Sequence, residues 1–287
     1  MKMNKVLVHL HLYYHDQTDY FISKLKNISL ADWDLVVTYT KSEPTNFSKL
    51  IAINPNTKFQ KVENIGYDIW PFIYVIKQTD LSKYEYIIKL HTKRSVKKCI
   101  ANVIPMRGFE WRDSLVDGVL YTSDYFTKIL NKFENNPSIG MISNLKTYSK
   151  RNWNSYSPRV AEELDKLRLK SHENHFCMGT MFIARAHIFK PLQTENINQI
   201  LFEDTINDQK RDFTSAHYYE RLLSVLPSAM GYKHLPASPK KREQLIIKAI
   251  RILEKPVRWI FGIEKKGLDK RKFIRIFGIE FYIQKQK

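Results

Sequence analysis

The chain has 287 residues, of which 43% are hydrophobic and 26% are charged, and its net charge is +18. These are the values of a globular protein that can bury a large core, and they exclude a chain without a fold. No run of 18 apolar residues occurs, and His9 and His11 interrupt the apolar stretch after the basic N-terminus. We therefore expect a first strand there, and neither a membrane-spanning helix nor a signal peptide.

Apolar runs alternate with helical patterns along the first third of the chain. Strands are predicted at 6–12, 34–39, 58–62 and 84–90, and helices at 16–27 and 47–53. A turn at 64–68 precedes a further helix, in whose first turn Pro71 can lie. This alternation predicts an α/β domain with a mostly parallel sheet and helices on both faces.

The second part of the chain continues the pattern and then changes character. Helices are predicted at 113–134, 153–173 and 215–226, and strands at 139–142 and 176–184. After the Pro-Ala-Ser-Pro segment 236–239 the sequence becomes basic and amphipathic, so we divide it into a domain at 1–236 and an extension at 237–287. In the extension we expect a helix that Pro256 bends or ends. The pentapeptide at 260–264 is repeated at 276–280.

The positive charge is concentrated in the extension. Residues 240–287 contain 15 Lys and Arg against 5 Asp and Glu, a net charge of +10. A nucleic acid or an anionic membrane surface would suit this charge, and a lysine-rich composition without a partner is the alternative. RNA-binding signatures are absent, so we expect no nucleic acid. The two cysteines, Cys99 and Cys177, lie far apart, which fits a reducing cytosol and forms no metal-ligand pair.

The richest polar motifs surround the strand predicted at 84–90. Before it lies an Asn-x-Gly-x-Asp turn, and after it four polar or cationic residues follow in sequence: Asn64, Gly66 and Asp68, then His91, Thr92, Lys93 and Arg94. Ligands of open α/β sheets bind outside the carboxyl ends of the strands. The cations therefore indicate an anionic ligand, most simply the phosphates of a nucleotide. The alternatives are an ordinary tight turn and ordinary surface bases.

Six segments of the chain resemble the rhamnan synthesis protein F family of bacterial glycosyltransferases. In the family's order they are VHLHLYYHD, ENIGYDIWPF, KLHTKRS, WRDSL, FCMGTMFIARAHIF and AHYYERLL, and they span roughly residues 6–223. The resemblance implies a GT-A-like, Rossmann-like fold and the transfer of a sugar from a nucleotide sugar. It does not identify the sugar.

The resemblance also implies roles for residues of the donor site. Many GT-A enzymes hold a metal with an Asp-x-Asp pair after the fourth strand, but His91, Thr92 and Lys93 follow that strand here. The Asp-x-Asp of this chain, Asp32 and Asp34, lies instead at the start of the second predicted strand. We therefore expect no metal and no cofactor, with Lys93, Arg94 or Arg112 offsetting the charge of the diphosphate. Asp68 and Asn64 are expected to contact the nucleoside or the sugar.

Further candidates lie on the other predicted strands. His9 and His11 share one face of the first strand and could border the base, as could Thr38, although each histidine could equally be a satisfied core residue. Gly179 and Thr180 would lie on the acceptor side, where a small residue allows close approach.

The acceptor hydroxyl requires a base. Glu220 is the first choice, with His217 and Asp212 as alternatives, although a salt bridge would explain Glu220 as well.

These expectations combine into one hypothesis. The donor is a nucleotide sugar, with dTDP-rhamnose favoured and UDP-galactose or another UDP-hexose as the alternative. The acceptor is a lipid-linked or surface polysaccharide at the cytoplasmic face of the membrane, which the basic segment 240–287 would contact peripherally. A noncatalytic nucleic-acid-binding protein is the alternative of another class.

Overall fold

The computed structural model describes residues 4–41, 47–95, 98–100, 104–149, 157–171, 175–206, 214–266, 271–277 and 279–283. The chain forms two compact units, one that ends at Pro239 and one that begins at Lys240. The first unit contains the sheet and every residue proposed for the site except Asp212, which lies outside the described residues.

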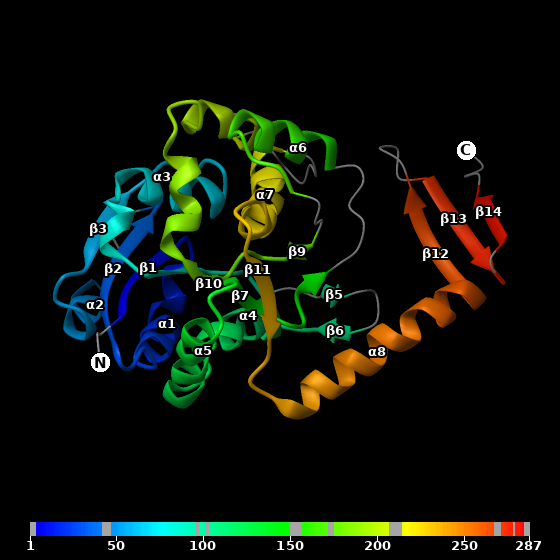
Figure 1. Ribbon diagram of the computed structural model, residues 1–287, viewed down its shortest axis with the longest axis horizontal. Helices are drawn as coiled ribbons and strands as arrows, with labels where there is room; N and C mark the ends of the chain where they lie inside the picture. Colours follow the sequence, from blue (N-terminus) through cyan, green and yellow to red (C-terminus); the bar gives the residue numbers. More distant parts are fainter. Residues whose placement is uncertain are drawn as a thin grey trace. The chain divides into compact units, whose positions relative to one another are not determined.

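The described part of the first unit is built on a seven-stranded sheet (Figure 1). Its strands are β1 Asn4–Leu12, β2 Ala31–Tyr39, β3 Lys58–Lys61, β4 Tyr86–His91, β7 Ile139–Asn144, β10 Phe182–Arg185 and β11 Lys233–Ala237. Their order is β3-β2-β1-β4-β10-β7-β11, and β10 runs antiparallel to both of its neighbours while the other pairs are parallel. The predicted α/β class with a mostly parallel sheet is confirmed.

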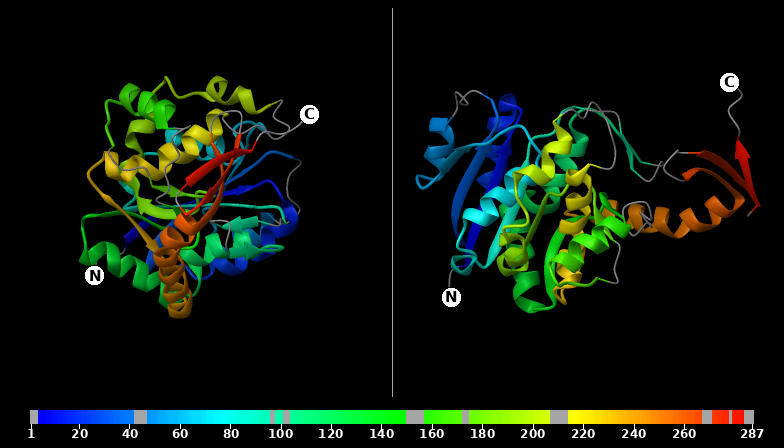
Figure 2. Two further views of the ribbon diagram at one scale, coloured as in Figure 1. Left: turned by 90° about the vertical axis from the view of Figure 1, so that its right-hand side faces the viewer. Right: turned by 90° about the horizontal axis from the view of Figure 1, so that it is seen from above.

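Helices cover both faces of this sheet (Figures 1 and 2). One face packs against α1 Thr18–Leu25, α4 Glu110–Leu120 and α5 Ser123–Asn135, and the other against α3 Ile69–Gln78 and α7 Ser215–Ala229. Smaller elements complete the unit: α2 Phe47–Ile53, α6 Ser157–Lys166, the 3-10 helices His15–Gln17, Leu81–Lys83, Ala186–Gln193 and Gln199–Thr205, and the short strands β5 Lys98–Ile100, β6 Ile104–Met106, β8 Tyr148–Ser149 and β9 Phe176–Cys177.

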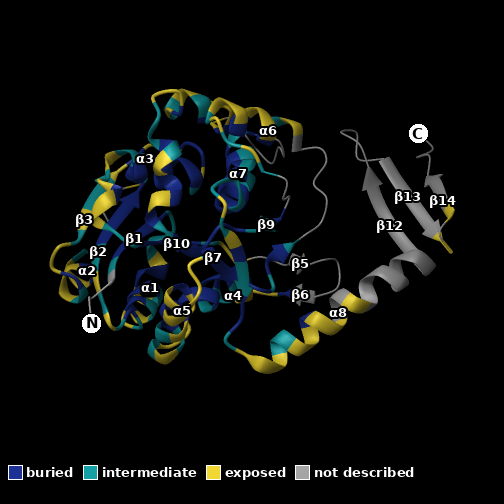
Figure 3. Ribbon diagram, viewed as in Figure 1, coloured by how far each residue is buried: buried dark blue, intermediate teal, exposed yellow. Residues whose placement is uncertain are grey.

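The two faces of the central strands differ in chemistry. In β1, Val6, Val8 and Leu10 are fully buried in the core with α1, α4 and α5. Each such side chain contributes about 1.5–3 kcal/mol by leaving water. The opposite face of the same strand holds His9 and His11, which are also buried (dark blue strands in Figure 3). Buried polar groups on a sheet covered on both sides require partners or a function.

The strand order reverses between β1 and β4. From β1 the chain adds β2 and β3 on one side, whereas β4 pairs with the other edge of β1. Ligands of open α/β sheets bind at such a switch point, outside the carboxyl ends of the strands. The register pairs His9 with Lys89 and His11 with His91, so four polar side chains of β1 and β4 adjoin on one face.

Most predicted elements agree with the structure, but three predictions were wrong about where an element is interrupted or ends. The helix predicted at 153–173 is described from Ser157 and ends at Lys166. The helix predicted at 113–134 is two helices, because the Thr122 hydroxyl accepts from the Tyr125 N–H and begins α5. The strand predicted at 176–184 is divided into β9 and β10, because Gly179 and Thr180 adopt left-handed φ angles of 87° and 40°.

The second unit consists of α8 Lys241–Ile260 and a three-stranded antiparallel sheet, β12 Phe261–Lys266, β13 Arg271–Ile276 and β14 Ile279–Ile283. We expected Pro256 to bend or end this helix, and the helix continues past it to Ile260, so the second alternative was wrong. Leu245 and Ile252 are 68% and 74% exposed, and Ile279 near the β13–β14 turn is 62% exposed. Within the described residues, no helix is both long and apolar enough to cross a bilayer.

Candidate functional site

The centre of the candidate site is a buried ion pair. Asp68 lies directly before α3, and Lys89 lies in the middle of β4, where its side chain has no exposure to solvent. The Lys89 Nζ is 2.5 Å from Asp68 Oδ2. Burying an ammonium is costly unless a counter-charge and hydrogen bonds compensate. The Asp68 carboxylate provides that counter-charge for Lys89.

A strained loop supplies the third member of the cluster. Thr180 Oγ1 accepts from Lys89 Nζ at 3.0 Å and donates to Asp68 Oδ2 at 3.1 Å. Thr180 has a φ of 40°, which is unfavourable for a β-branched residue, and Gly179 before it has a φ of 87°. A Cβ on Gly179 would lie 2.8 Å from Leu115 Cδ1, so only glycine fits. Backbone strain of this kind is typical of functional sites.

A second left-handed pair positions Asp68. Gly66 and Tyr67 have φ angles of 67° and 54°, and the Gly66 N–H donates to Thr205 Oγ1 at 2.7 Å. A Cβ on Gly66 would lie 2.6 Å from Trp70 Cβ. The Asn-x-Gly-x-Asp motif is therefore a tight turn, as its sequence allows, and this turn carries Asp68 to Lys89.

The carboxyl end of β4 adds two further side chains to the cluster. His91 Nδ1 is 3.5 Å from Lys89 Nζ and 3.3 Å from Asp68 Oδ2. Lys93 Nζ is 3.7 Å from the other carboxylate oxygen, Asp68 Oδ1, and is about a quarter exposed. Lys93 is thus the cation of the cluster that solvent, and a ligand, can reach.

The charges of the cluster follow from burial and mutual attraction. Burial alone would raise the pKa of Asp68, but His91, Lys89 and Lys93 outweigh it and hold the pKa well below its usual range. Burial lowers the pKa of Lys89, and Asp68 counteracts this. Burial also lowers the pKa of His91 well below its usual value. These shifts favour an ionised Asp68 carboxylate beside an uncharged His91 imidazole.

The polar face continues from β4 onto β1 and β2. His9 Nε2 and His11 Nδ1 each lie 2.9 Å from Thr38 Oγ1. Burial lowers the pKa of both rings, that of His11 to about 4. Phe72 of α3 packs against this row, with its ring 5.7 Å from that of His9. The three residues predicted from the first two strands thus form one network beside the ion pair.

The predicted acceptor side adjoins the cluster through Gly179. Glu220 Oε1 accepts from the Gly179 N–H at 3.0 Å, next to Thr180, and its other oxygen is 3.4 Å from Arg221 Nη1. Glu220 is about one-fifth exposed. The contacts of Glu220 therefore agree with both interpretations from the sequence: its carboxylate lies beside the cluster, and it also pairs with an arginine. His217 lies on Tyr67, ring to ring at 5.9 Å, and bonds to Thr214 Oγ1.

Other predicted residues do not join the cluster. Thr92 Oγ1 accepts from the backbone N–H groups of Tyr13 and Tyr14 and so fixes the end of β1. Arg112 bonds to Asp113 and lies 3.5 Å over the Tyr20 ring. Asn64 and Arg94 are exposed.

Sequence reasoning missed Lys89, the best-connected residue of the site. The signal was available, because Lys89 interrupts the apolar strand Tyr-Ile-Ile-Lys-Leu-His, and a lysine there must be paired once the strand is buried on both sides. The prediction of the strand rested on its apolar residues, and it named only the polar and cationic residues after the end of the strand as site candidates.

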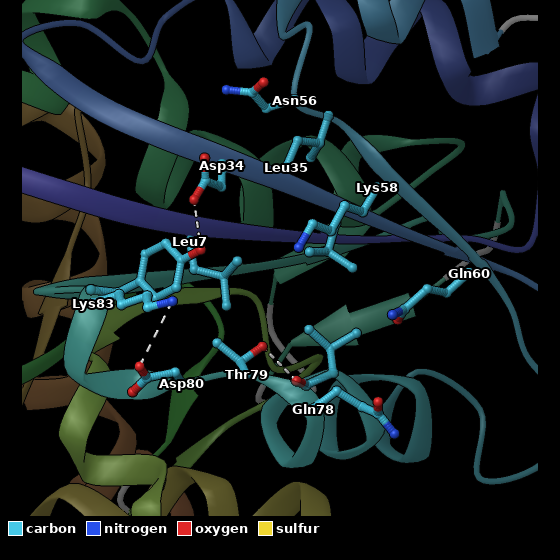
Figure 4. Close-up of a pocket in the computed structure, with 13 residues that line it drawn as sticks. Leu7, Asp34, Leu35, Asn56, Lys58, Gln60, Gln78, Thr79, Asp80 and Lys83 are labelled. Atoms are coloured by element: carbon cyan, nitrogen blue, oxygen red, sulfur yellow. Dashed lines mark hydrogen bonds and ion pairs between the residues drawn. The ribbon is translucent and has the colours of Figure 1, made fainter.

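A separate pocket of about 240 Å³ lies at the opposite, amino-terminal end of the parallel strands (Figure 4). Two of its carboxylates already have partners, since Tyr84 donates to Asp34 and Lys83 lies beside Asp80. It lies far along the strands from Asp68, so it is not part of the candidate site. Within the described residues, no three His, Cys, Asp or Glu side chains group as metal ligands would.

Comparison with known proteins identifies the family. A profile of rhamnan synthesis protein F matches residues 1–232. The chain belongs to the rhamnan synthesis protein F family. The predicted family is thereby confirmed, and the matched range includes every described residue of the cluster.

Relatives and similar structures are distant. The protein WxcX, described as uncharacterized, from two strains of Xanthomonas campestris pv. campestris is 23% identical over 234 residues, which cover 78% of this chain and 31% of WxcX. This chain therefore spans about a third of the length of those relatives.

Two solved structures illustrate the likeness in fold. A Pyrobaculum calidifontis mannosyltransferase in complex with GDP-Man and Mn²⁺ is 12% identical, with a TM-score of 0.41, over 90% of this chain and 65% of that one. A Mycobacterium tuberculosis glucosyl-3-phosphoglycerate synthase is 10% identical, with a TM-score of 0.37, over 96% of this chain and 91% of that one.

Proposed function

We propose that the chain is a glycosyltransferase that moves a sugar from a nucleotide-sugar donor to a glycan acceptor. The observation that supports this most is the Asp68–Lys89 pair with Lys93 beside it, at the point where the strand order reverses between β1 and β4. A cation and a hydroxyl-accepting carboxylate at such a switch point suit a nucleoside diphosphate linked to a sugar. Membership of the rhamnan synthesis protein F family agrees with that chemistry.

Two side chains take distinct roles in donor binding. Lys93, the reachable cation, offsets the charge of the diphosphate as it leaves. The Asp68 Oδ2 atom is occupied by Lys89 and Thr180, whereas Oδ1 has only the distant Lys93 contact. Oδ1 is therefore the atom that accepts a hydroxyl of the ribose or the sugar.

The transfer step needs a base on the acceptor side. The acceptor oxygen forms a bond to the anomeric carbon, the bond from that carbon to the phosphate oxygen breaks, and the electron pair leaves with the nucleoside diphosphate. The acceptor proton passes to a base, for which Glu220 is best placed, at the edge of the cluster and partly exposed. Lys93 supplies the reachable positive charge, so the proposal requires no divalent metal.

We favour dTDP-rhamnose as the donor, with UDP-galactose or another UDP-hexose as the alternative, and a lipid-linked or surface polysaccharide as the acceptor. The second unit supports a membrane location at the inner face of the cell membrane. Its net charge of +10 over 240–287 matches an anionic leaflet, and Leu245 and Ile252 of α8 are exposed apolar residues seven positions apart.

The function is tested by incubating the purified chain with each nucleotide sugar and measuring thermal stabilisation and release of the nucleoside diphosphate. At least one nucleotide sugar should stabilise the protein, and Glu220→Gln should release the diphosphate at least ten-fold more slowly. The control is Glu203→Gln, an exposed glutamate of the 3-10 helix Gln199–Thr205, which should behave as the wild type. Stabilisation by RNA at physiological salt, without any response to nucleotide sugars, would instead favour the nucleic-acid-binding alternative.

The membrane location is tested by sedimentation with vesicles of phosphatidylglycerol at low and high salt. Binding should weaken with salt, since charge attraction is screened over about 8 Å at physiological ionic strength. The double change Leu245→Ser and Ile252→Ser should weaken it further. Ile200→Ser serves as the control, because Ile200 is 72% exposed but lies in the first unit. Equal binding by both variants would remove the membrane proposal.

A further inference from the structure

The Lys89 ammonium is fully used inside the protein. Its three N–H bonds match three neighbours: Asp68 Oδ2 at 2.5 Å, Thr180 Oγ1 at 3.0 Å and His91 Nδ1 at 3.5 Å. Because it has no donor left and no exposure, Lys89 does not bind a ligand itself. Its effect on a ligand must pass through the groups that it holds.

His91 Nδ1 lies near both Lys89 Nζ, at 3.5 Å, and Asp68 Oδ2, at 3.3 Å, but only the contact with Lys89 has hydrogen-bond geometry, so it decides where the imidazole proton lies. An ammonium has no lone pair, so in this hydrogen bond His91 Nδ1 is the acceptor. The ring is uncharged, because burial lowers the pKa of His91 well below its usual value. A neutral imidazole whose Nδ1 accepts carries its single proton on Nε2.

That Nε2–H has no partner among the described residues. The atom is buried, and the whole residue is 1% exposed. A buried donor without an acceptor costs about 1–3 kcal/mol, so its presence calls for an explanation. His91 is the last residue of β4, directly before Thr92 and the reachable Lys93, at the switch point where a ligand is expected.

We propose that Lys89 is a positioning residue, which fixes the tautomer of His91 so that its Nε2–H donates to a phosphate oxygen of the bound nucleoside diphosphate. This inference rests on the proposed function for the identity of the ligand. The oxygen is a phosphate oxygen because Lys93, two residues after His91 and partly exposed, attracts an anion to this end of β4. Nε2 is buried in the free chain, so a neighbouring side chain rotates on binding to let the phosphate reach it, as is common at binding sites.

The tautomer is measured by NMR on the full chain labelled with ¹⁵N-histidine. The chain has nine histidines, and the His91→Leu variant identifies the signals of His91 by their disappearance. In the free wild type, Nδ1 should show the shift of an unprotonated nitrogen and Nε2 that of a protonated one. The opposite assignment would overturn the proposal without any variant.

Two substitutions show whether Lys89 is responsible. Lys89→Met removes the donor to Nδ1, so the ring proton should move to Nδ1, where Asp68 Oδ2 lies 3.3 Å away. Lys93→Met is the matched control, because Lys93 contacts Asp68 Oδ1 and not the ring, and the tautomer should stay as in the wild type. If Lys89→Met leaves the tautomer unchanged in a folded protein, Lys89 does not set it. Should that variant fail to fold, the double variant Lys89→Met and Asp68→Asn removes both charges, and its ring should then lose the fixed Nε2–H state.

The ligand is probed with UDP and with dTDP. Either should shift the His91 Nε2–H signal at the concentration that stabilises the protein thermally. Thermal stabilisation without a shift at His91 would overturn this inference and leave the proposed function intact. The absence of stabilisation by any nucleotide or nucleotide sugar would instead remove the proposed function and, with it, the phosphate contact, while the tautomer result would stand on the free protein.

Discussion

Buried histidines at two places on the same sheet differ in how their ring nitrogens are hydrogen-bonded. One group is His234 on β11, and the other is His9, His11 and His91 on β1 and β4. His234 of β11 bonds on both sides, with Nε2 2.7 Å from Ser143 Oγ and Nδ1 3.3 Å from the Ser224 carbonyl oxygen. His91 of β4 bonds through Nδ1 alone. Burial lowers the pKa of both rings, that of His234 to about 3. Neither burial nor pKa therefore separates a structural histidine from a binding one.

The difference lies in hydrogen-bond satisfaction. His234 is complete, since a hydroxyl can donate to one nitrogen while the other donates to a carbonyl, so it holds β7, β11 and α7 together. His91 and His9 each keep one buried nitrogen without a partner among the described residues. Buried polar atoms are paired in the great majority of cases, so we expect a ligand at these two nitrogens, which lie on the strands β1 and β4 at the switch point. Substitutions in the two groups should therefore separate stability from activity.

The largest effect should come from the ion pair. Asp68→Asn should lower the transfer rate about 100-fold or more, because it removes the carboxylate that contacts the donor. It should also lower the free energy of unfolding by roughly 3 kcal/mol, because Lys89 is left buried without its counter-charge. Initial rates and urea unfolding measure the two quantities.

The double variant Asp68→Asn and Lys89→Met sharpens this result. It should regain most of the lost stability, since an apolar replacement of a buried ion pair is often neutral, but none of the lost transfer. Transfer near the wild-type rate in either variant would return Asp68 to a purely structural role in its turn.

Next in size are two substitutions that should act in opposite ways. His91→Leu removes the unpaired buried Nε2–H but also the acceptor of one Lys89 N–H, so the two effects should offset and stability should change little, while the affinity for UDP or dTDP should fall about ten-fold or more. Ser143→Ala leaves His234 Nε2 without its donor, so the free energy of unfolding should fall by about 1–3 kcal/mol while nucleotide affinity stays the same. Calorimetric titration and urea unfolding of both variants provide the test. The result would contradict the difference between the two groups of histidines if Ser143→Ala lost nucleotide affinity, or if His91→Leu lost stability without losing nucleotide affinity.

Lowering the pH should destabilise the folded protein through both groups of histidines, because the folded state keeps the rings of both groups neutral. The pKa is about 4 for His11 and about 3 for His234, against 6.5 for an ordinary histidine. Below pH 6.5 the unfolded chain therefore binds more protons than the folded one, and lowering the pH favours unfolding. Each ring should cost about 1.4 kcal/mol per pH unit until the pH reaches its folded pKa. The groups facing these rings are Asp68 and Lys89 for His11, and His175 for His234.

Urea unfolding at pH 7 and at pH 5 measures this slope. His234→Gln should reduce the slope by the share of one ring, and His11→Asn should do the same. Equal stability at the two pH values in the wild type would show that the rings are not held neutral.

The sequence predicted the sheet and much of the site, and the reasons for its failures are local. Strand and helix periodicity placed β1 to β4 and α1 to α3, and the family's motifs identified Asp68, His91 and Lys93, which the fold brings together. The left-handed Thr180, which divides the predicted strand 176–184, leaves no periodic signal because its φ is imposed by its bonds to Asp68 and Lys89.

Long-range partners account for the other differences. Arg112 was a sound candidate by residue type, and the structure shows it bonded to Asp113 and Gln17 and lying over the Tyr20 ring, not in contact with Asp68 or Lys89. Lys89 was overlooked because the role of a lysine in a strand depends on the side chain that it contacts. That side chain belongs to Asp68, which is 21 residues distant in sequence. Such pairings follow from the topology, which periodicity alone does not determine.

The smallest effect should come from chelation. The proposal assigns the charge that offsets the diphosphate to Lys93, so transfer should continue unchanged in excess EDTA. The comparison of rates with and without EDTA, followed by addition of Mn²⁺, measures this directly. Lys93→Ala is the informative variant, because removal of the reachable cation should slow transfer in EDTA and in Mn²⁺ alike. If EDTA abolishes transfer and Mn²⁺ restores it, a metal rather than Lys93 offsets the diphosphate. Asp68 would then be a candidate metal ligand, and its Oδ1 atom, which Lys89 leaves unoccupied, would be the place to look for the ion.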